Sequence, residues 1–326
     1  MIAAAWRLQR LVVIVALAVV GAFAIWLAVT GTMQSNAWTT LQQANHGTCL
    51  VTPGSACAAA ASNYYSLTHL SSVSLGLLFA LPLLLGLLLG APLVAREIEQ
   101  RTNRMAWTQS ITRTRWLFVK LGVGALTCVA LVAALAPLVE WWTNATRRVP
   151  RIYPATFDVA GIVPIAYVLF AFVLGTALGA LIRRPGWAFA TGVPVYAGIR
   201  FLVRFYIRPD LVAPVTVNGN AHGYVTTGWS IHGGYVPIGR SFPAVGQSWQ
   251  SGEEIINRCT FSLVRDQKIP TNAWTVCTRR EGLHWVTQFQ PPNHFWPLQG
   301  IEAAIFCVIA LALVGSSVLA VRWWRT

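Results

Sequence analysis

The sequence predicts an all-α membrane protein with six transmembrane helices and a small exterior insertion rich in β-strands and loops. Of its 326 residues, 55% are hydrophobic and only 10% are charged, a composition typical of membrane proteins. Six apolar runs are each close to the ~20 residues that a helix needs to cross the hydrocarbon core. These runs lack the strict alternation of a transmembrane β-barrel, so helices are the predicted spanning elements.

The predicted spans follow one another along the chain as Leu11–Thr30, Val73–Val94, Trp116–Leu138, Gly161–Ile182, Trp187–Arg204 and Ile301–Val321. The fifth is the least regular, because Pro194 and Arg200 interrupt it. The first follows basic residues, as the apolar part of a signal peptide does. Its length of about 20 residues exceeds the usual 7–15, so we interpret it as an uncleaved span.

Basic residues place both termini in the cytoplasm, since short cytoplasmic loops of membrane proteins carry an excess of Lys and Arg. The arginines on the predicted inner side are Arg7, Arg10, Arg96, Arg101, Arg104, Arg113, Arg115, Arg183, Arg184, Arg322 and Arg325. The exterior loop Gly31–Ser72 has no Lys or Arg, although Arg147, Arg148 and Arg151 lie on that same side. Much of the net charge of +14 is thus a topology signal, and nucleic acid is not an expected partner.

Three regions are expected along the chain. Residues 1–205 form a transmembrane domain that includes a charged cytoplasmic loop at 95–116. Residues 206–300 form the exterior insertion, whose Gly, Pro, Thr and Val content favours short strands and turns. Residues 301–326 form the sixth span and a cytoplasmic tail.

The cysteines agree with this topology. Four of them fall in predicted exterior segments, where disulfides persist. We expect local Cys49–Cys57 and Cys259–Cys277 bridges, with free exterior thiols as the alternative. The remaining two cysteines lie within predicted spans, where a small apolar thiol packs well.

No catalytic residue, cofactor site or metal site is predicted. The phosphate-binding motif of P-loop ATPases is absent, so this chain is not expected to hydrolyse ATP. All six histidines fall in exterior segments, and their spacing matches no zinc-ligand pattern. A membrane hydrolase has no motif to support it.

Two Gly-x-x-x-Gly motifs lie within spans, Gly86/Gly90 in the second and Gly175/Gly179 in the fourth. Small residues at this spacing allow the backbones of neighbouring helices to approach closely in lipid. The motifs are compatible with a dimer contact or with packing inside one chain.

Charged residues near the outer ends of spans are candidates for a gate or a substrate path, because charges at membrane depth are costly and often functional. Arg200, Arg204 and Arg208 recur every four residues, and Asp158 precedes the fourth span. We expect an Arg200–Glu302 or an Arg204–Glu140 ion pair at the outward exit. The alternative is that these side chains extend to the lipid headgroups.

The loop at 95–116 resembles the segment between the second and third spans of bacterial ATP-binding-cassette (ABC) type-2 permeases. The sequence NHFWPLQGIE at 293–302 is similar to the entry of the last span in the actinobacterial-type branch of that family. The matching loop residues are Glu97, Glu99, Thr102, Trp107, Thr108, Gln109, Arg113, Arg115 and Trp116. One difference is Arg101, where the family often has Gly before the Thr.

The resemblance implies that this loop is a coupling helix that binds a separate cytoplasmic ATPase. The residues expected to couple are Glu97, Glu99, Thr102, Met105, Trp107, Gln109 and Arg113. The carboxylates would meet basic residues of the partner, and the apolar side chains would anchor the contact. An amphipathic helix lying on anionic lipid is the alternative.

The function that the resemblance implies is the non-catalytic permease subunit of an ABC exporter in the bacterial plasma membrane. A second permease subunit, expected to be another copy of this chain, would complete the pore, and ATP and Mg would bind only the ATPase. The substrate class is an amphiphilic drug, lipid or peptide. The alternatives are a membrane sensor or immunity protein that binds a ligand through its exterior domain, and, third, a membrane enzyme.

Overall fold

The computed structural model describes residues 2–45, 56–99, 112–146, 150–218, 228–237, 254, 259 and 273–323. The chain divides into two compact units. The membrane unit comprises Met1–Val149, Ala155–Arg208 and Trp296–Thr326, and the second unit comprises Pro150–Pro154 and Pro209–Phe295. The membrane unit thus extends to Arg208, slightly beyond the predicted boundary at 205. Helix α11 begins at Phe295, before Ile301, where the sixth span was predicted to begin.

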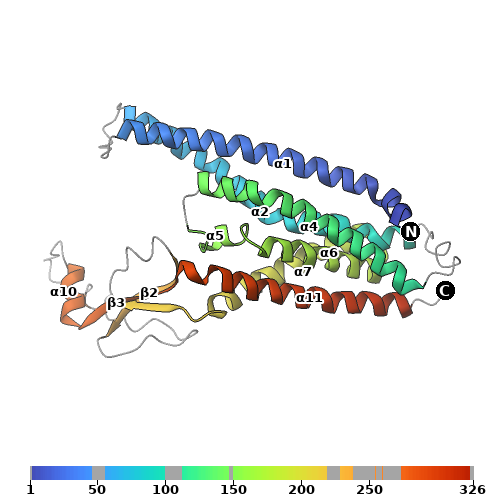
Figure 1. Cartoon of the computed structure of the whole chain (residues 1–326). Helices are drawn as coiled ribbons and strands as arrows, with labels where there is room; N and C mark the ends of the chain where they lie inside the picture. Colours follow the sequence, from blue (N-terminus) through green and yellow to red (C-terminus); the bar gives the residue numbers. More distant parts are fainter. Residues whose placement is uncertain are drawn as a thin grey trace. The chain divides into compact units, whose positions relative to one another are not determined.

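The membrane unit is helical, as predicted. Its long helices are α1 (Ile2–Asn45), α2 (Ala56–Glu99), α4 (Arg113–Thr146), α6 (Val163–Ile182), α7 (Pro185–Leu202) and α11 (Phe295–Trp323). Six segments within the described residues are long and apolar enough to cross a membrane, which confirms the predicted number of spans. The first turn of α1 and the last turn of α11 lie at the same end of this unit (Figure 1), as an even number of spans requires.

Two helices are much longer than predicted. At 1.5 Å per residue, the 44 residues of α1 and of α2 each extend about 66 Å, roughly twice the hydrocarbon thickness. The two helices continue side by side beyond the other long helices of the membrane unit (Figure 1), and the rings of Trp38 and Tyr64 are in contact, with their centroids 5.3 Å apart. Most of the segment expected to be an exterior loop is therefore a helical pair, because its Ala, Ser and Gln content permits helix outside lipid.

The two Gly-x-x-x-Gly motifs face each other within one chain. A Cβ atom at Gly90 would lie 2.1 Å from the carbonyl oxygen of Phe172, and one at Gly179 would lie 2.6 Å from the carbonyl oxygen of Ala91. The backbones of α2 and α6 thus approach so closely that only hydrogen fits at these positions. The two motifs therefore mediate helix packing inside one chain. Of the two alternatives left open by the sequence, a dimer contact or packing within the chain, this contact is the second.

The second unit contains a three-stranded antiparallel sheet in the order β1-β3-β2, formed by β1 (Val215–Asn218), β2 (Trp229–Pro237) and β3 (Leu283–Gln290). Strand β2 has an irregularity between Ser230 and His232, and Tyr235 packs edge-to-face on Trp285 of β3. The predicted strand-rich insertion is confirmed. A short helix, α10 (Ala273–Arg280), was not predicted.

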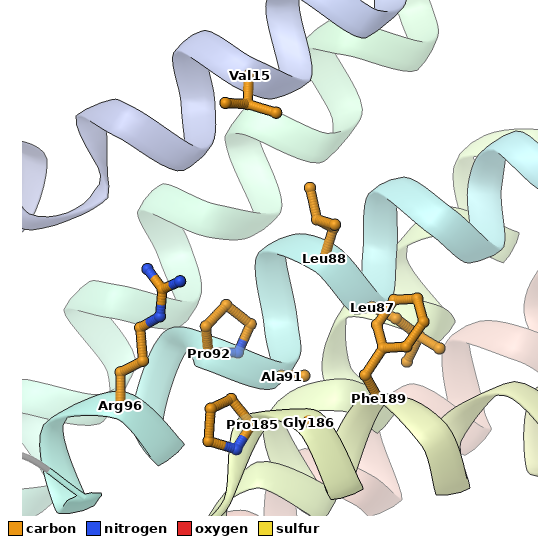
Figure 2. Close-up of a pocket in the computed structure, with 9 residues that line it drawn as sticks. All are labelled: Val15, Leu87, Leu88, Ala91, Pro92, Arg96, Pro185, Gly186 and Phe189. Atoms are coloured by element: carbon orange, nitrogen blue, oxygen red, sulfur yellow. The ribbon is translucent and has the colours of Figure 1, made fainter.

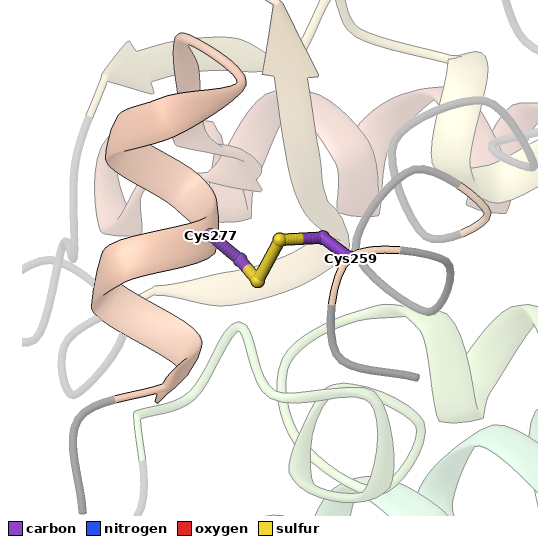
Figure 3. The surroundings of a disulfide bond; sticks show 2 residues. All are labelled: Cys259 and Cys277. Atoms are coloured by element: carbon purple, nitrogen blue, oxygen red, sulfur yellow. A yellow bond between two sulfur atoms is a disulfide. The ribbon is translucent and has the colours of Figure 1, made fainter. Parts of the chain in front are cut away.

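One predicted disulfide is present in the second unit. Cys277 of α10 is bonded to Cys259, with a Cα–Cα distance of 5.8 Å (Figure 3). Cys57 is also disulfide-bonded, and its predicted partner, Cys49, lies outside the described residues. Cys128 and Cys307 are free thiols, as expected for residues within spans.

Substitution of Gly90 by Ala should destabilise the membrane unit, because the added methyl group meets backbone atoms that cannot move independently. We expect a loss of about 1–3 kcal/mol, typical of an over-packed contact, seen as a lower melting temperature in detergent. Gly76→Ala, in the same helix, is the control, since its Cβ would meet no atom within 4 Å. Equal melting temperatures for the two variants would contradict the close α2–α6 contact.

Candidate functional site

Three arginines lie at four-residue spacing in the last part of the fifth span. Arg200 lies in the last turn of α7, Arg204 in the π-helical turn η1 (Val203–Ile207), and Arg208 opens the 3-10 turn η2. In an α-helix each four-residue step rotates a side chain by about 40° around the axis, so this spacing drifts off one face. The wider π turn reverses part of that drift. As a result, all three guanidinium groups reach the carboxylate of Asp158.

Asp158 lies between the short helix α5 (Pro154–Phe157) and α6, and its side chain is fully buried. Arg208 Nη2 donates a hydrogen bond to Oδ1, and Arg200 Nη2 lies 3.4 Å from the same oxygen. Arg204 Nη1 lies 2.7 Å from Oδ2. The N–H groups of Arg204 are not directed along this contact, so it is an ion pair, and Oδ2 has no hydrogen-bond donor among the described residues.

Glu302 in α11 is the second carboxylate of the site. Arg208 binds it through two hydrogen bonds, Nε to Oε2 at 2.7 Å and Nη2 to Oε1 at 2.8 Å, the bidentate geometry of a strong charge-assisted pair. The hydroxyl of Tyr167 lies within hydrogen-bonding distance of both Glu302 and Asp158. This hydroxyl has a single proton, so it donates to one carboxylate at a time while accepting from Arg208 Nη2 at 3.1 Å.

Aromatic rings enclose these charges. The guanidinium carbon of Arg200 lies 3.5 Å from the centroid of the Tyr167 ring, and that of Arg208 lies 4.6 Å from the Phe157 ring. Tyr167 in turn packs edge-to-face on Phe306 of α11. Such stacking stabilises a cation that has been removed from water. We name this group of residues the buried charge cluster: Asp158, Tyr167, Arg200, Arg204, Arg208 and Glu302.

Gln299 holds the turn that carries Asp158. Its Oε1 accepts hydrogen bonds from the backbone N–H groups of Ile162 and Val163, which begin α6 and have no partner inside the helix. Its Nε2 donates to the carbonyl oxygens of Phe157 and Ala160. One buried side chain of α11 therefore satisfies four backbone groups on both sides of Asp158 and fixes the position of its carboxylate.

The buried charge cluster has an excess of positive charge. Three guanidinium groups face two carboxylates, so the ionised cluster has a net charge of +1, and the buried Nη1 of Arg208 has no acceptor among the described residues. Removing ions from water costs several kcal/mol each unless they are paired. The cluster can thus hold the ends of α6, the fifth span and α11 together, and it offers positive potential to an anion.

The two ion pairs expected from the sequence are wrong. Glu302 is paired with Arg208 instead of Arg200, and Arg204 contacts Asp158 instead of Glu140. Glu140 is an exposed residue of α4. Sequence spacing shows which arginines share a helix face. It does not show that the turn before α6 directs Asp158 toward these arginines, and Asp158 is therefore the partner that the sequence missed. A role as a gate for Arg200, Arg204, Glu140 and Glu302 stays a prediction.

A second polar site lies at the C-terminal end of α2, where this helix packs against α4. Glu97 is bound by Lys120 of α4, a buried residue whose ammonium group also lies 4.4 Å from the centroid of the Trp116 ring. Glu97 is therefore already engaged within the chain, so reversal of its charge would disturb the fold as well as any contact with an ATPase. Glu99 is exposed.

Most of the expected coupling residues cannot be placed. Thr102, Met105, Trp107 and Gln109 lie outside the described residues, as does the Arg113 side chain. At the far end of this segment, Thr112 caps α4 through its hydroxyl, which accepts from the backbone N–H of Arg115. Docking of an ATPase here stays a prediction, and among the described residues no group of three metal-ligand side chains occurs.

Neutralising one member of the Arg208–Glu302 pair should leave an unpaired buried charge. We expect Arg208→Gln and Glu302→Gln each to lower the stability by about 3–5 kcal/mol, and the double variant to cost clearly less than the sum. Thermal unfolding of the purified protein in detergent would measure this cycle. Arg204→Gln is the control and should cost at most about 1 kcal/mol, because its side chain is 27% exposed. Additive losses would show that the two residues are not coupled.

Comparison with known proteins assigns the membrane unit to a family. The family model described as ABC-2 membrane transporter related matches residues 15–208, more than half of the chain. The match includes Asp158, Tyr167 and the three arginines of the cluster, and it ends before Glu302. Searches of curated proteins and of solved structures found no match. With its six membrane-spanning helices, this chain is a multi-pass membrane protein that belongs to the ABC-2 membrane transporter related family.

Proposed function

We propose that the chain is the permease subunit of an ABC exporter in the bacterial plasma membrane. It would move an amphiphilic substrate outward, using ATP and Mg bound by a separate cytoplasmic ATPase. The observation that carries this proposal is the family match over residues 15–208, which covers five of the six spans. A second copy of this chain is proposed to complete the transporter.

The ends of α2 and α4 support the proposed coupling to the ATPase. The segment 100–111 joins these two helices. Next to this segment, Lys120 of α4 connects the helices, because it binds Glu97 of α2 and lies over the ring of Trp116 of α4. Lys120 also donates to the carbonyl oxygen of Leu93. A displacement of the joining segment by an ATPase would therefore move α2 and α4 as a pair instead of separating them.

The buried charge cluster is proposed to control the exit of the substrate. It holds the end of the fifth span against α6 and α11, so an outward opening at this point has to separate charges that stabilise one another. Arg204 is its most exposed cation and pairs only with Asp158 among the described acidic residues.

Arg204→Gln should therefore weaken closure without unfolding the protein. We expect a raised basal ATPase rate of the reconstituted transporter without substrate. The measurement compares ATP hydrolysis in proteoliposomes made with wild-type and variant chains. An unchanged basal rate would restrict the cluster to a structural role.

Glu99→Lys should weaken the proposed association with the ATPase while leaving the fold intact. Glu99 is exposed, and unfavourable charge contacts at an interface cost up to several kcal/mol. Co-purification with a co-expressed ABC ATPase from the same genome would measure the effect at moderate salt. Glu140→Lys is the matched control, because it makes the same change in net charge about 30 Å farther along α4 than Lys120. Equal recovery of the ATPase with both variants would argue against docking at this segment.

A further inference from the structure

A pocket of about 380 Å³ lies between α1, α2 and α7, within the volume range of small-molecule sites. Its walls are mostly apolar and include Val15 of α1, Leu87 and Leu88 of α2, and Phe189 of α7. Figure 2 shows Leu87 and Phe189 together at one end of this group. Val15 and Leu88 are exposed on the surface of two helices that are apolar enough to cross a membrane, so the pocket is open at this surface.

Arg96 is the charged residue of the pocket, at the end away from Phe189 (Figure 2). It lies in the last turn of α2, and its side chain is exposed. The ion pairs of the described residues leave it without an acidic partner, in contrast to the adjacent Glu97, which is bound by Lys120. The pocket therefore combines an apolar wall with one cation that has no acidic partner in the part of the chain that the structure describes.

We propose that this pocket binds an anionic lipid from the adjacent leaflet. An acyl chain would lie against Leu87, Leu88 and Phe189, and the negatively charged headgroup would contact the guanidinium of Arg96. The apolar lining suits an acyl chain, and the guanidinium of Arg96 favours a headgroup with net negative charge over a zwitterionic one, whose own cation offsets the phosphate. This inference rests on the proposed function in one respect: the bound lipid represents the class of substrate that the permease would take from the cytoplasmic leaflet.

Photolabelling of the purified chain in lipid nanodiscs tests the site without an ATPase or nucleotide. The probe is phosphatidic acid with a diazirine in one acyl chain, and the comparison is phosphatidylcholine with the same chain. We expect the anionic probe to label peptides containing Leu87, Leu88 and Phe189 about two- to five-fold more strongly, as a contact with a partly exposed charge predicts. Arg96→Gln should abolish this preference, and Arg96→Lys should keep it.

Filling the pocket provides an independent test. Gly186 lines the pocket, and a Cβ atom there would meet no other atom within 4 Å, so Gly186→Leu adds apolar bulk at the pocket from an unobstructed Cβ position. We expect it to reduce labelling by both probes. Gly198→Leu is the matched control, because it makes the same change in α7 at a second unobstructed position outside the pocket. Its labelling should equal that of the wild type.

Equal labelling by the two probes, or a preference that survives in Arg96→Gln, would overturn the role of Arg96. Unchanged labelling in Gly186→Leu would overturn the pocket itself. Labelling that behaves as expected in a chain that neither binds an ATPase nor transports would refute the proposed function and keep the lipid site. The two proposals can therefore fail separately.

Discussion

The close backbone contact between α2 and α6 is the constraint on which the rest of the membrane unit depends. Lipid offers no hydrophobic drive for helices to associate, so close packing has to supply the stability. Gly90 and Gly179 allow this packing, because neither position has room for a Cβ atom. Helix α6 is buried over most of its length as a result. The N-terminal part of α6 can then present Tyr167 to charges that would be unstable in lipid.

The buried charge cluster shows how charges are retained at membrane depth. Each arginine that reaches Asp158 also contacts an aromatic ring, so the loss of water is offset by both ion pairing and stacking. Replacing the whole set by apolar residues would be tolerable in principle, whereas removing Arg208 or Glu302 alone leaves the other charge buried without its partner. Arg204 is the most exposed of the three arginines, with 27% of its side chain accessible to solvent.

Sequence periodicity and charge distribution were enough to predict the six spans and a strand-rich insertion, because hydrophobic length and turn residues are local properties. The Cys259–Cys277 bridge was predictable for the same reason. The partners of Arg200 and Arg204 were not, because they depend on a turn whose position is fixed by Gln299, more than 130 residues away from the helix start it satisfies. The helical extension of α1 and α2 was also missed, since polar sequence outside lipid is equally compatible with a loop.

The contacts of α2 and α6 suggest how distant sites are connected in the proposed transporter. Helix α2 carries Leu87 in the pocket, Gly90 in the contact with α6, and Glu97 in the pair with Lys120, all within about three turns. Because the backbones of α2 and α6 are in contact, a shift of α2 driven by the ATPase would move α6 as well. The opposite end of α6 carries Tyr167, which contacts both carboxylates of the buried charge cluster. Movement at the ATPase end is therefore expected to reach both the lipid pocket and the proposed exit through one rigid helix pair.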